Sequence, residues 1–139
     1  MNSFLRFLQF RFIPVNADFA LLALRLWIGL TLLLAHGWSK LTGFSAMSGG
    51  FPDPIGLGSE VTLALAVFVE VIASALLVVG LLTRLAALLI AVQLLIAFFI
   101  VHGGAFSGPQ SGELAWIYAG AAFAVFFAGA GRFSVDGRR

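Results

Sequence analysis

The sequence predicts an all-α transmembrane four-helix bundle with both termini cytoplasmic. Of its 139 residues, 61% are hydrophobic and only 10% are charged, a composition that lipid solvates better than water does. Four apolar stretches, with their connections, use up nearly the whole chain. Arginines gather at one side of these stretches and Lys40 alone lies at the other, and this bias sets the predicted orientation.

The composition also excludes several classes of function. The chain contains no cysteine, which removes disulfides, thiolate nucleophiles, iron–sulfur ligation and a CxxC redox relay. The net charge of +2 comes from sparse basic residues at the segment ends, where they orient a membrane protein. This distribution argues against nucleic-acid binding. We therefore expect a single membrane domain without a second soluble domain.

The chain divides into three parts. In residues 1–16, apolar side chains recur at helical spacing between arginines, which predicts an interfacial amphipathic segment that Pro14 ends. Residues 17–131 form the predicted four-helix transmembrane domain. Residues 132–139 form a basic tail, which the arginine bias places in the cytoplasm.

Four spanning helices are expected in order, over about 18–36, 60–82, 84–102 and 114–130. Asp18 is the expected N-cap of the first helix. Gly80 and Thr83 supply a stop for the second helix and an N-cap for the third. So short a link makes these two helices antiparallel neighbours.

Residues 42–59 predict a long loop between the first two helices. The segment is rich in glycine and contains Pro52 and Pro54, with apolar residues scattered through it. We expect it to dip back onto the bundle. Such a loop is either a lid over a binding site or an ordinary surface loop.

Two charges lie inside the apolar stretches, Arg25 in the first and Glu70 in the second. Because an unpaired charge at membrane depth is costly, the two are expected to form an ion pair. At about 1.5 Å per residue from the cytoplasmic ends, Arg25 lies roughly 10 Å deep, Gln93 roughly 13 Å and Glu70 roughly 18 Å. These three polar groups are expected to meet in one layer. The pair is either a functional site or a fastener between helices.

A stripe on the first helix joins this layer to the outer surface. Arg25, Gly29, Leu32, His36 and Lys40 recur at steps of three or four residues. One interpretation is a polar track that leads to an outward-opening ligand pocket. The other is a packing face whose glycine admits a neighbouring helix, with His36 and Lys40 snorkelling to the headgroups.

Cofactor sites are sparse in this sequence. His36 and His102 are predicted at the outer ends of two helices, too shallow to hold a b-type haem in the bundle centre. No two histidines share a helix at metal-binding spacing, so no metal site is predicted. Trp27, Phe68 and Phe123 could line a quinone pocket, but packing would explain these aromatic residues equally well.

The chain resembles the DoxX family of small four-helix membrane proteins over roughly residues 20–136. The matching residues are Arg25, His36-Gly37-Trp38-Ser39-Lys40-Leu41, Glu70, Gly80-Leu81-Leu82-Thr83-Arg84, and Gly129-Ala130-Gly131 followed by Ser134-Val135-Asp136. The family includes proteins similar to the small membrane subunit of a thiosulfate:quinone oxidoreductase, and others implicated in quinone or thiol redox homeostasis. The resemblance implies a redox association in the bacterial inner (plasma) membrane, but it assigns no catalytic residue.

Two hypotheses of function follow. In the first, the chain is a quinone-linked or small-molecule redox accessory subunit, and its intramembrane ligand pocket is formed by Arg25, His36, Lys40, Glu70 and Gln93. His36 and Lys40 would hydrogen-bond an oxygen-bearing head group or relay its proton. Because the sequence has no flavin, nicotinamide or iron–sulfur motif, a protein partner would supply electrons. In the second hypothesis, the chain is a non-catalytic structural subunit or assembly factor, with a protein partner or a second copy of itself.

Overall fold

The computed structural model describes residues 3–138, which contain helices and no strand. The elements in chain order are α1 (Ser3–Leu8), α2 (Ala17–Thr31), η1 (Leu32–Gly37), α3 (Trp38–Thr42), α4 (Phe44–Met47), α5 (Ser59–Val67), η2 (Phe68–Ala73), α6 (Ser74–Val79), α7 (Thr83–Ile96), η3 (Ala97–Val101), α8 (Glu113–Ala128) and η4 (Asp136–Arg138). The segments η1, η2 and η3 are π-helical turns inside longer helices.

Three continuous helices in the described part of the chain are long and apolar enough to cross a membrane: Ala17–Thr42, Ser59–Val79 and Thr83–Val101. A fourth apolar helix, α8, has 16 residues, slightly fewer than a straight crossing needs. The expectation of an all-helical membrane protein is confirmed. The fourth crossing and the cytoplasmic position of both termini stay predictions.

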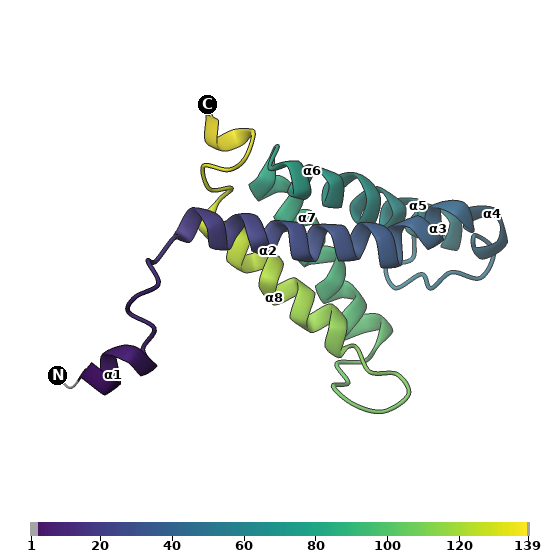
Figure 1. Ribbon diagram of the computed structural model, residues 1–139. Helices are drawn as coiled ribbons and strands as arrows, with labels where there is room; N and C mark the ends of the chain where they lie inside the picture. Colours follow the sequence, from purple (N-terminus) through teal and green to yellow (C-terminus); the bar gives the residue numbers. More distant parts are fainter. Residues whose placement is uncertain (1–2, 139) are drawn as a thin grey trace.

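The long helices alternate in direction, which gives the protein two distinct ends (Figure 1). The loop end carries residues 43–58 and 102–112. The tail end carries the turn at residues 80–82 and the C-terminal segment 129–138. Figure 1 shows α8 and the later part of α7 running away from α2 and α5 toward the loop end. The helices therefore separate at the end where the candidate site lies.

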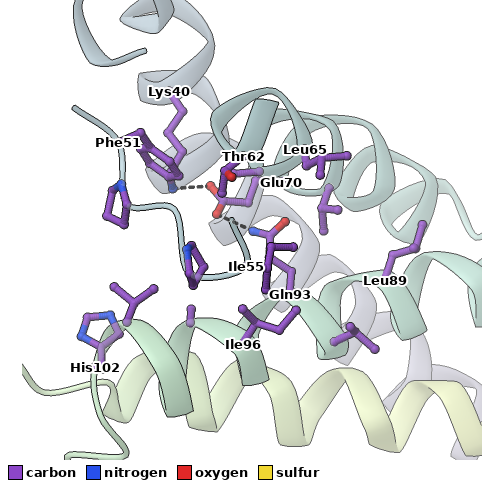
Figure 2. Close-up of a pocket in the computed structure, with 17 residues that line it drawn as sticks. Lys40, Phe51, Ile55, Thr62, Leu65, Glu70, Leu89, Gln93, Ile96 and His102 are labelled. Atoms are coloured by element: carbon purple, nitrogen blue, oxygen red, sulfur yellow. Dashed lines mark hydrogen bonds and ion pairs between the residues drawn. The ribbon is translucent and has the colours of Figure 1, made fainter. Parts of the chain in front are cut away.

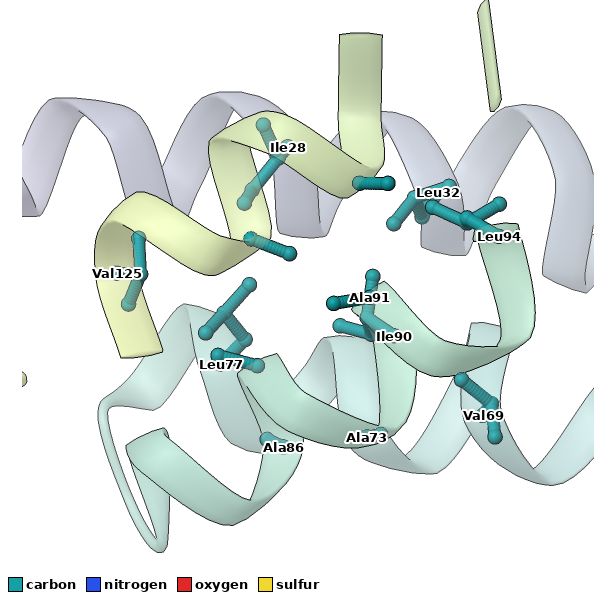
Figure 3. Close-up of a cluster of buried hydrophobic side chains, with 13 residues drawn as sticks. Ile28, Leu32, Val69, Ala73, Leu77, Ala86, Ile90, Ala91, Leu94 and Val125 are labelled. Carbon is teal, nitrogen blue, oxygen red and sulfur yellow. The ribbon is translucent and has the colours of Figure 1, made fainter. Parts of the chain in front are cut away.

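The core is built from aliphatic side chains and alanines of all four long helices (Figure 3). Ala86, Ala87 and Ala91 of α7 are fully buried, as are Ala119 and Ala122 of α8. Small residues let two helix backbones approach closely, and this close packing associates helices where lipid offers no hydrophobic driving force. Gly29 also makes the close helix contact expected of a packing face. A Cβ on Gly29 would lie 2.7 Å from Val78 Cγ2, so the absence of a side chain lets the second long helix approach.

The helix ends differ from the predicted ones in their caps. Asn16 caps α2, because its side chain accepts a hydrogen bond from Phe19 N at 3.0 Å; Asp18 instead accepts from Arg132 N at 2.9 Å. Gly80 ends α6 in the left-handed region, as expected. Thr83 is not an N-cap. Asp136 of the C-terminal segment accepts hydrogen bonds from both Leu82 N and Thr83 N, so a residue 53 or 54 positions away caps α7.

The segments outside the long helices are partly as expected. The loop after the first helix contains the short helix α4, and its remainder returns toward the bundle. In the N-terminal segment, α1 is exposed along its whole length, and its placement at the membrane interface stays a prediction. Met1 and Asn2 of that segment, and Arg139 of the predicted tail, lie outside the described residues.

Candidate functional site

Arg25 is fully buried near the tail end and does not contact Glu70. Its Nη1 donates to Leu77 O at 3.0 Å and to Val78 O at 3.1 Å, and its Nη2 donates to Phe133 O at 2.7 Å. The predicted ion pair between Arg25 and Glu70 is therefore wrong. Arg25 instead fastens the C-terminal end of the second long helix and the tail to the first helix.

The direction of side chains on a helix explains this result. Each Cα–Cβ bond tilts toward the helix N-terminus, so the Arg25 side chain extends toward the tail end and away from the membrane centre. There it meets carbonyls of the last turn of α6, at the negative end of the helix dipole. Gly80 makes room, because a Cβ there would lie 2.6 Å from Arg25 Nη1.

The partner of Glu70 is Lys40. Lys40 Nζ lies 2.5 Å from Glu70 Oε2, and Gln93 Nε2 donates to Glu70 Oε1 at 2.8 Å. Figure 2 shows the three side chains converging from three different helices. The Glu70 side chain is only 8% exposed and that of Lys40 only 18%. The expected meeting of Glu70 and Gln93 is confirmed, with Lys40 in the place predicted for Arg25.

Lys40 does not snorkel outward. Like Arg25, it lies on the first long helix and extends toward that helix's N-terminus, which for Lys40 means inward from the loop end. The long lysine stem therefore carries the ammonium group to Glu70. Burying a charge without a partner is unfavourable, so the ion pair lowers the free energy of both buried side chains.

All three π-helical turns surround this site. Glu70 lies in η2, His36 in η1, and η3 contributes Ala97 and Val101 to the neighbouring cavity. Single π turns inside α-helices are frequent at functional sites. Gly37 at the end of η1 allows the first two helices to approach, because a Cβ there would lie 2.6 Å from Glu70 O.

A cavity of 380 Å³, here called the larger cavity, lies beside the three polar groups. Its walls come from α5, η2, α7 and η3, and its cover is Phe51, Pro52, Pro54 and Ile55 of the first loop (Figure 2). Leu65 of α5 and Val92 of α7 line it and are nearly half exposed. The larger cavity is therefore apolar, has one polar wall, and opens between two spanning helices where lipid would be.

Asp53 holds the covering loop in place. Its carboxylate accepts hydrogen bonds from Gly58 N at 2.8 Å, Leu57 N at 2.9 Å and the Thr62 hydroxyl at 2.8 Å. The Gly58 and Thr62 bonds stabilise the charged form and hold the pKa of Asp53 below its ordinary value. Of the two interpretations of this loop, its position over the larger cavity favours a lid.

A second cavity of 280 Å³, the smaller cavity, lies on the other side of the ion pair. It shares Lys40, Glu70, Ala97 and His102 with the larger cavity. Its other lining residues are Leu32, His36, Leu94, Ser111, Gly112, Leu114, Ala115 and Tyr118. His36 and Tyr118 contact each other edge to face with their ring centres 6.4 Å apart.

The five residues predicted for the pocket are thus divided. Lys40, Glu70 and Gln93 meet at the larger cavity, His36 lines the smaller one, and Arg25 lines neither. Sequence reasoning missed the contributions of Asp53, Thr62 and Tyr118. The Asp-Pro pair in a glycine-rich loop was a signal for a turn-stabilising carboxylate. Nothing in the sequence pattern marked Tyr118 as a residue that lines a cavity.

The aromatic residues considered for a quinone pocket lie elsewhere. Trp27 is 77% exposed and Phe68 is 48% exposed, so both face the surroundings of the bundle. Phe123 packs against the core. None of the three lines either cavity. For metals, residues 3–138 contain no group of three or more His, Asp or Glu side chains that could hold an ion.

Comparison with known proteins identifies the family. Residues 20–103, more than half of the chain, match the DoxX family. A protein of Haemophilus influenzae, described only as uncharacterised, is 31% identical over 113 residues that cover 77% of this chain and 81% of the relative. No solved structure matches the chain. The matched region covers nearly all of the first long helix, the whole of the next two, and Lys40, Glu70 and Gln93. The chain is an integral membrane protein that belongs to the DoxX family.

Proposed function

We propose that this protein binds a quinone-like, lipid-soluble molecule in the larger cavity, as a redox accessory subunit of a complex in the bacterial inner membrane. The observation that carries the proposal is a 380 Å³ apolar cavity with one polar wall, formed by Lys40, Glu70 and Gln93. Ligand sites are typically apolar with a few placed polar groups, and this volume falls within their usual range.

The polar wall suits an oxygen-bearing head group. Lys40 uses one of its three ammonium hydrogens on Glu70, which leaves donors for a ligand oxygen. Gln93 donates to Glu70 through Nε2, so its amide oxygen is an acceptor for a ligand hydroxyl. A carbonyl and a hydroxyl are the head groups of a quinone and a quinol. The exposed apolar mouth between Leu65 and Val92 would accommodate the tail.

The redox role itself would need a partner. Lys40, Glu70 and Gln93 bind and orient, but none of them is an electron carrier, and the sequence has no flavin, nicotinamide or iron–sulfur motif. We therefore assign the chain the ligand-binding part of a quinone-linked reaction and leave electron transfer to a protein partner.

Binding of radiolabelled decyl-benzoquinone to the protein in nanodiscs tests the proposal, with empty nanodiscs as the background. Lys40→Met should weaken binding by about 10-fold to 150-fold, the equivalent of one hydrogen bond from a charged donor worth about 1.5–3 kcal/mol. Gln93→Leu should weaken it by about 2-fold to 10-fold, since the lost bond is neutral. Each variant is compared at a temperature where it is folded.

A matched pair of tryptophan variants separates the cavity from the general lipid-facing surface. Val92→Trp fills the mouth of the larger cavity and should abolish binding. Val61→Trp adds the same side chain to a residue that is 50% exposed on α5 and lines neither cavity. It should bind as the parent does. Equal binding by both variants would contradict the proposal.

The alternative function is a non-catalytic structural subunit or assembly factor. One observation favours it: Glu70 already has partners on both carboxylate oxygens, so the polar cluster needs no ligand to be satisfied. On this alternative the protein purified from its membrane contains no stoichiometric lipid-soluble molecule, as extraction and mass spectrometry would establish. It would also bind no decyl-benzoquinone above the nanodisc background.

A further inference from the structure

The Lys40–Glu70 ion pair is a partition between two cavities of different character. Both residues line the larger cavity and the smaller cavity, and His102 also borders both. The larger cavity opens toward lipid between Leu65 and Val92. The smaller one is bounded by Ser111 and Gly112 of the second loop, at the loop end of the bundle.

The smaller cavity has a mixed lining, with a larger share of polar side chains than the larger cavity has. His36, Tyr118 and Ser111 contribute polar atoms to it, in addition to the shared ion pair and His102. Its volume of 280 Å³ exceeds the share of about 30 Å³ that one molecule occupies in liquid water, so several waters fit. Water in this cavity would bond to its polar lining groups, as buried waters generally do.

A proton that leaves a ligand hydroxyl in the larger cavity is expected to leave through the titratable side chains of the cavity lining. The mouth of that cavity faces hydrocarbon, where a charge is strongly disfavoured. The titratable side chains that line the two cavities are His36 and Lys40 from the first long helix, Glu70 from η2, His102 after η3, and Tyr118 from α8. Of these, Lys40, Glu70 and His102 border both cavities, whereas His36 and Tyr118 line only the smaller one.

We propose that the Lys40–Glu70 pair exchanges protons between a ligand hydroxyl in the larger cavity and water in the smaller cavity, with His36 as the next proton carrier. The ligand O–H bond breaks as a Glu70 O–H bond forms, and the ligand oxyanion stays beside the Lys40 ammonium. Glu70 then returns to a carboxylate as the proton passes through water to His36 and out at the loop end. No electron moves in this step. The inference rests on the proposed ligand site and adds an exit to it.

A long-chain 2-alkyl-4-nitrophenol is a suitable probe, because it is a lipid-soluble phenol that titrates near neutral pH and has a yellow anion. The protein in nanodiscs is loaded with the probe, and the colour change after a rapid drop in pH reports how fast the bound anion regains its proton. His36→Gln keeps a polar side chain that cannot carry a proton at this pH. It should slow the protonation of the bound probe by roughly tenfold or more while leaving its Kd unchanged.

Two controls make the result specific. Ser39→Ala changes an exposed residue on the same helix that lines neither cavity, and it should leave the rate unchanged. Imidazole added to the buffer should restore part of the rate in His36→Gln, because it is small enough to carry protons into a hydrated space. His36→Gln combined with His102→Gln should be slower than His36→Gln alone, since His102 borders both cavities.

The outcomes separate this inference from the ligand site itself. If the probe binds and His36→Gln changes its protonation rate no more than Ser39→Ala does, the exit through the smaller cavity is wrong and the ligand site stands. If neither the probe nor decyl-benzoquinone binds above the nanodisc background, the proposed function fails and the inference fails with it.

Discussion

Lys40→Met should destabilise the protein more than any other single change at the polar site. The substitution keeps an unbranched side chain, one atom shorter than lysine, and leaves the Glu70 carboxylate, which is 8% exposed, with Gln93 as its remaining partner. Removing one member of a buried pair costs about 3–5 kcal/mol, and the 18% exposure of Lys40 places this pair near the lower end, at about 3 kcal/mol. Glu70→Gln should cost less, because the freed ammonium can turn toward the loop end.

Reversible unfolding in mixed detergent micelles measures these free energies. The double variant Lys40→Met with Glu70→Gln should be more stable than the sum of the single losses predicts, with a coupling energy of about 1–3 kcal/mol. Glu60→Gln removes a carboxylate from an exposed position on the same helix and should change stability by no more than about 0.5 kcal/mol. Additive single losses would refute the assignment of Lys40 as the partner of Glu70.

Three further outcomes are expected. Arg25→Met should lower the free energy of unfolding by about 3–5 kcal/mol, because the fully buried Arg25 gives up charge-assisted hydrogen bonds to three carbonyls, and an unchanged melting temperature would contradict this role. Gly37→Ala should lower the melting temperature, because the new Cβ meets Glu70 O at 2.6 Å, whereas Gly120→Ala has no neighbour within 4 Å and should stabilise its helix by up to about 1 kcal/mol. Asp53→Asn should speed hydrogen exchange at Leu57 and Gly58 at neutral pH. Because hydrogen bonds from Gly58 and Thr62 lower the pKa of Asp53, the parent loop should keep its protection above the ordinary pKa of aspartate and lose it only as pH falls through the lowered value.

The helices were predictable because hydropathy alone marks apolar stretches of spanning length. Gly80 was a readable stop, since a left-handed C-cap favours glycine. The caps of α2 and α7 were less predictable. Asn16 and Asp18 are both good capping residues two positions apart, and Asp136 reaches Thr83 only because the tail folds back onto the bundle. Capping rules consider only residues close to the helix end in sequence, so they do not predict a cap from a residue more than 50 positions away.

The sequence predicted part of the polar cluster inside the membrane. Depth along the helices correctly brought Glu70 to Gln93, because both lie near the middle of their helices. The same count was wrong for Arg25, because it gave the depth of the Cα atom. The guanidinium group lies several ångströms nearer the helix N-terminus. The same direction brings Lys40 inward. Applied to the sequence, this rule alone would have predicted Lys40, and not Arg25, as the partner of Glu70. The two cavities depend on how far the helices separate, and the hydropathy pattern of the sequence does not specify that distance.

Photoaffinity labelling tests the central claim of a ligand site at the Lys40–Glu70–Gln93 cluster most directly. A decyl-benzoquinone that carries a diazirine next to its ring is activated with the protein in nanodiscs, and the labelled residues are mapped by mass spectrometry. Labels should concentrate on peptides that contain Lys40, Glu70 and Gln93, and excess unlabelled quinone should remove them. Labels spread over outward-facing residues such as Trp27 and Phe127, and insensitive to competitor, would contradict the claim.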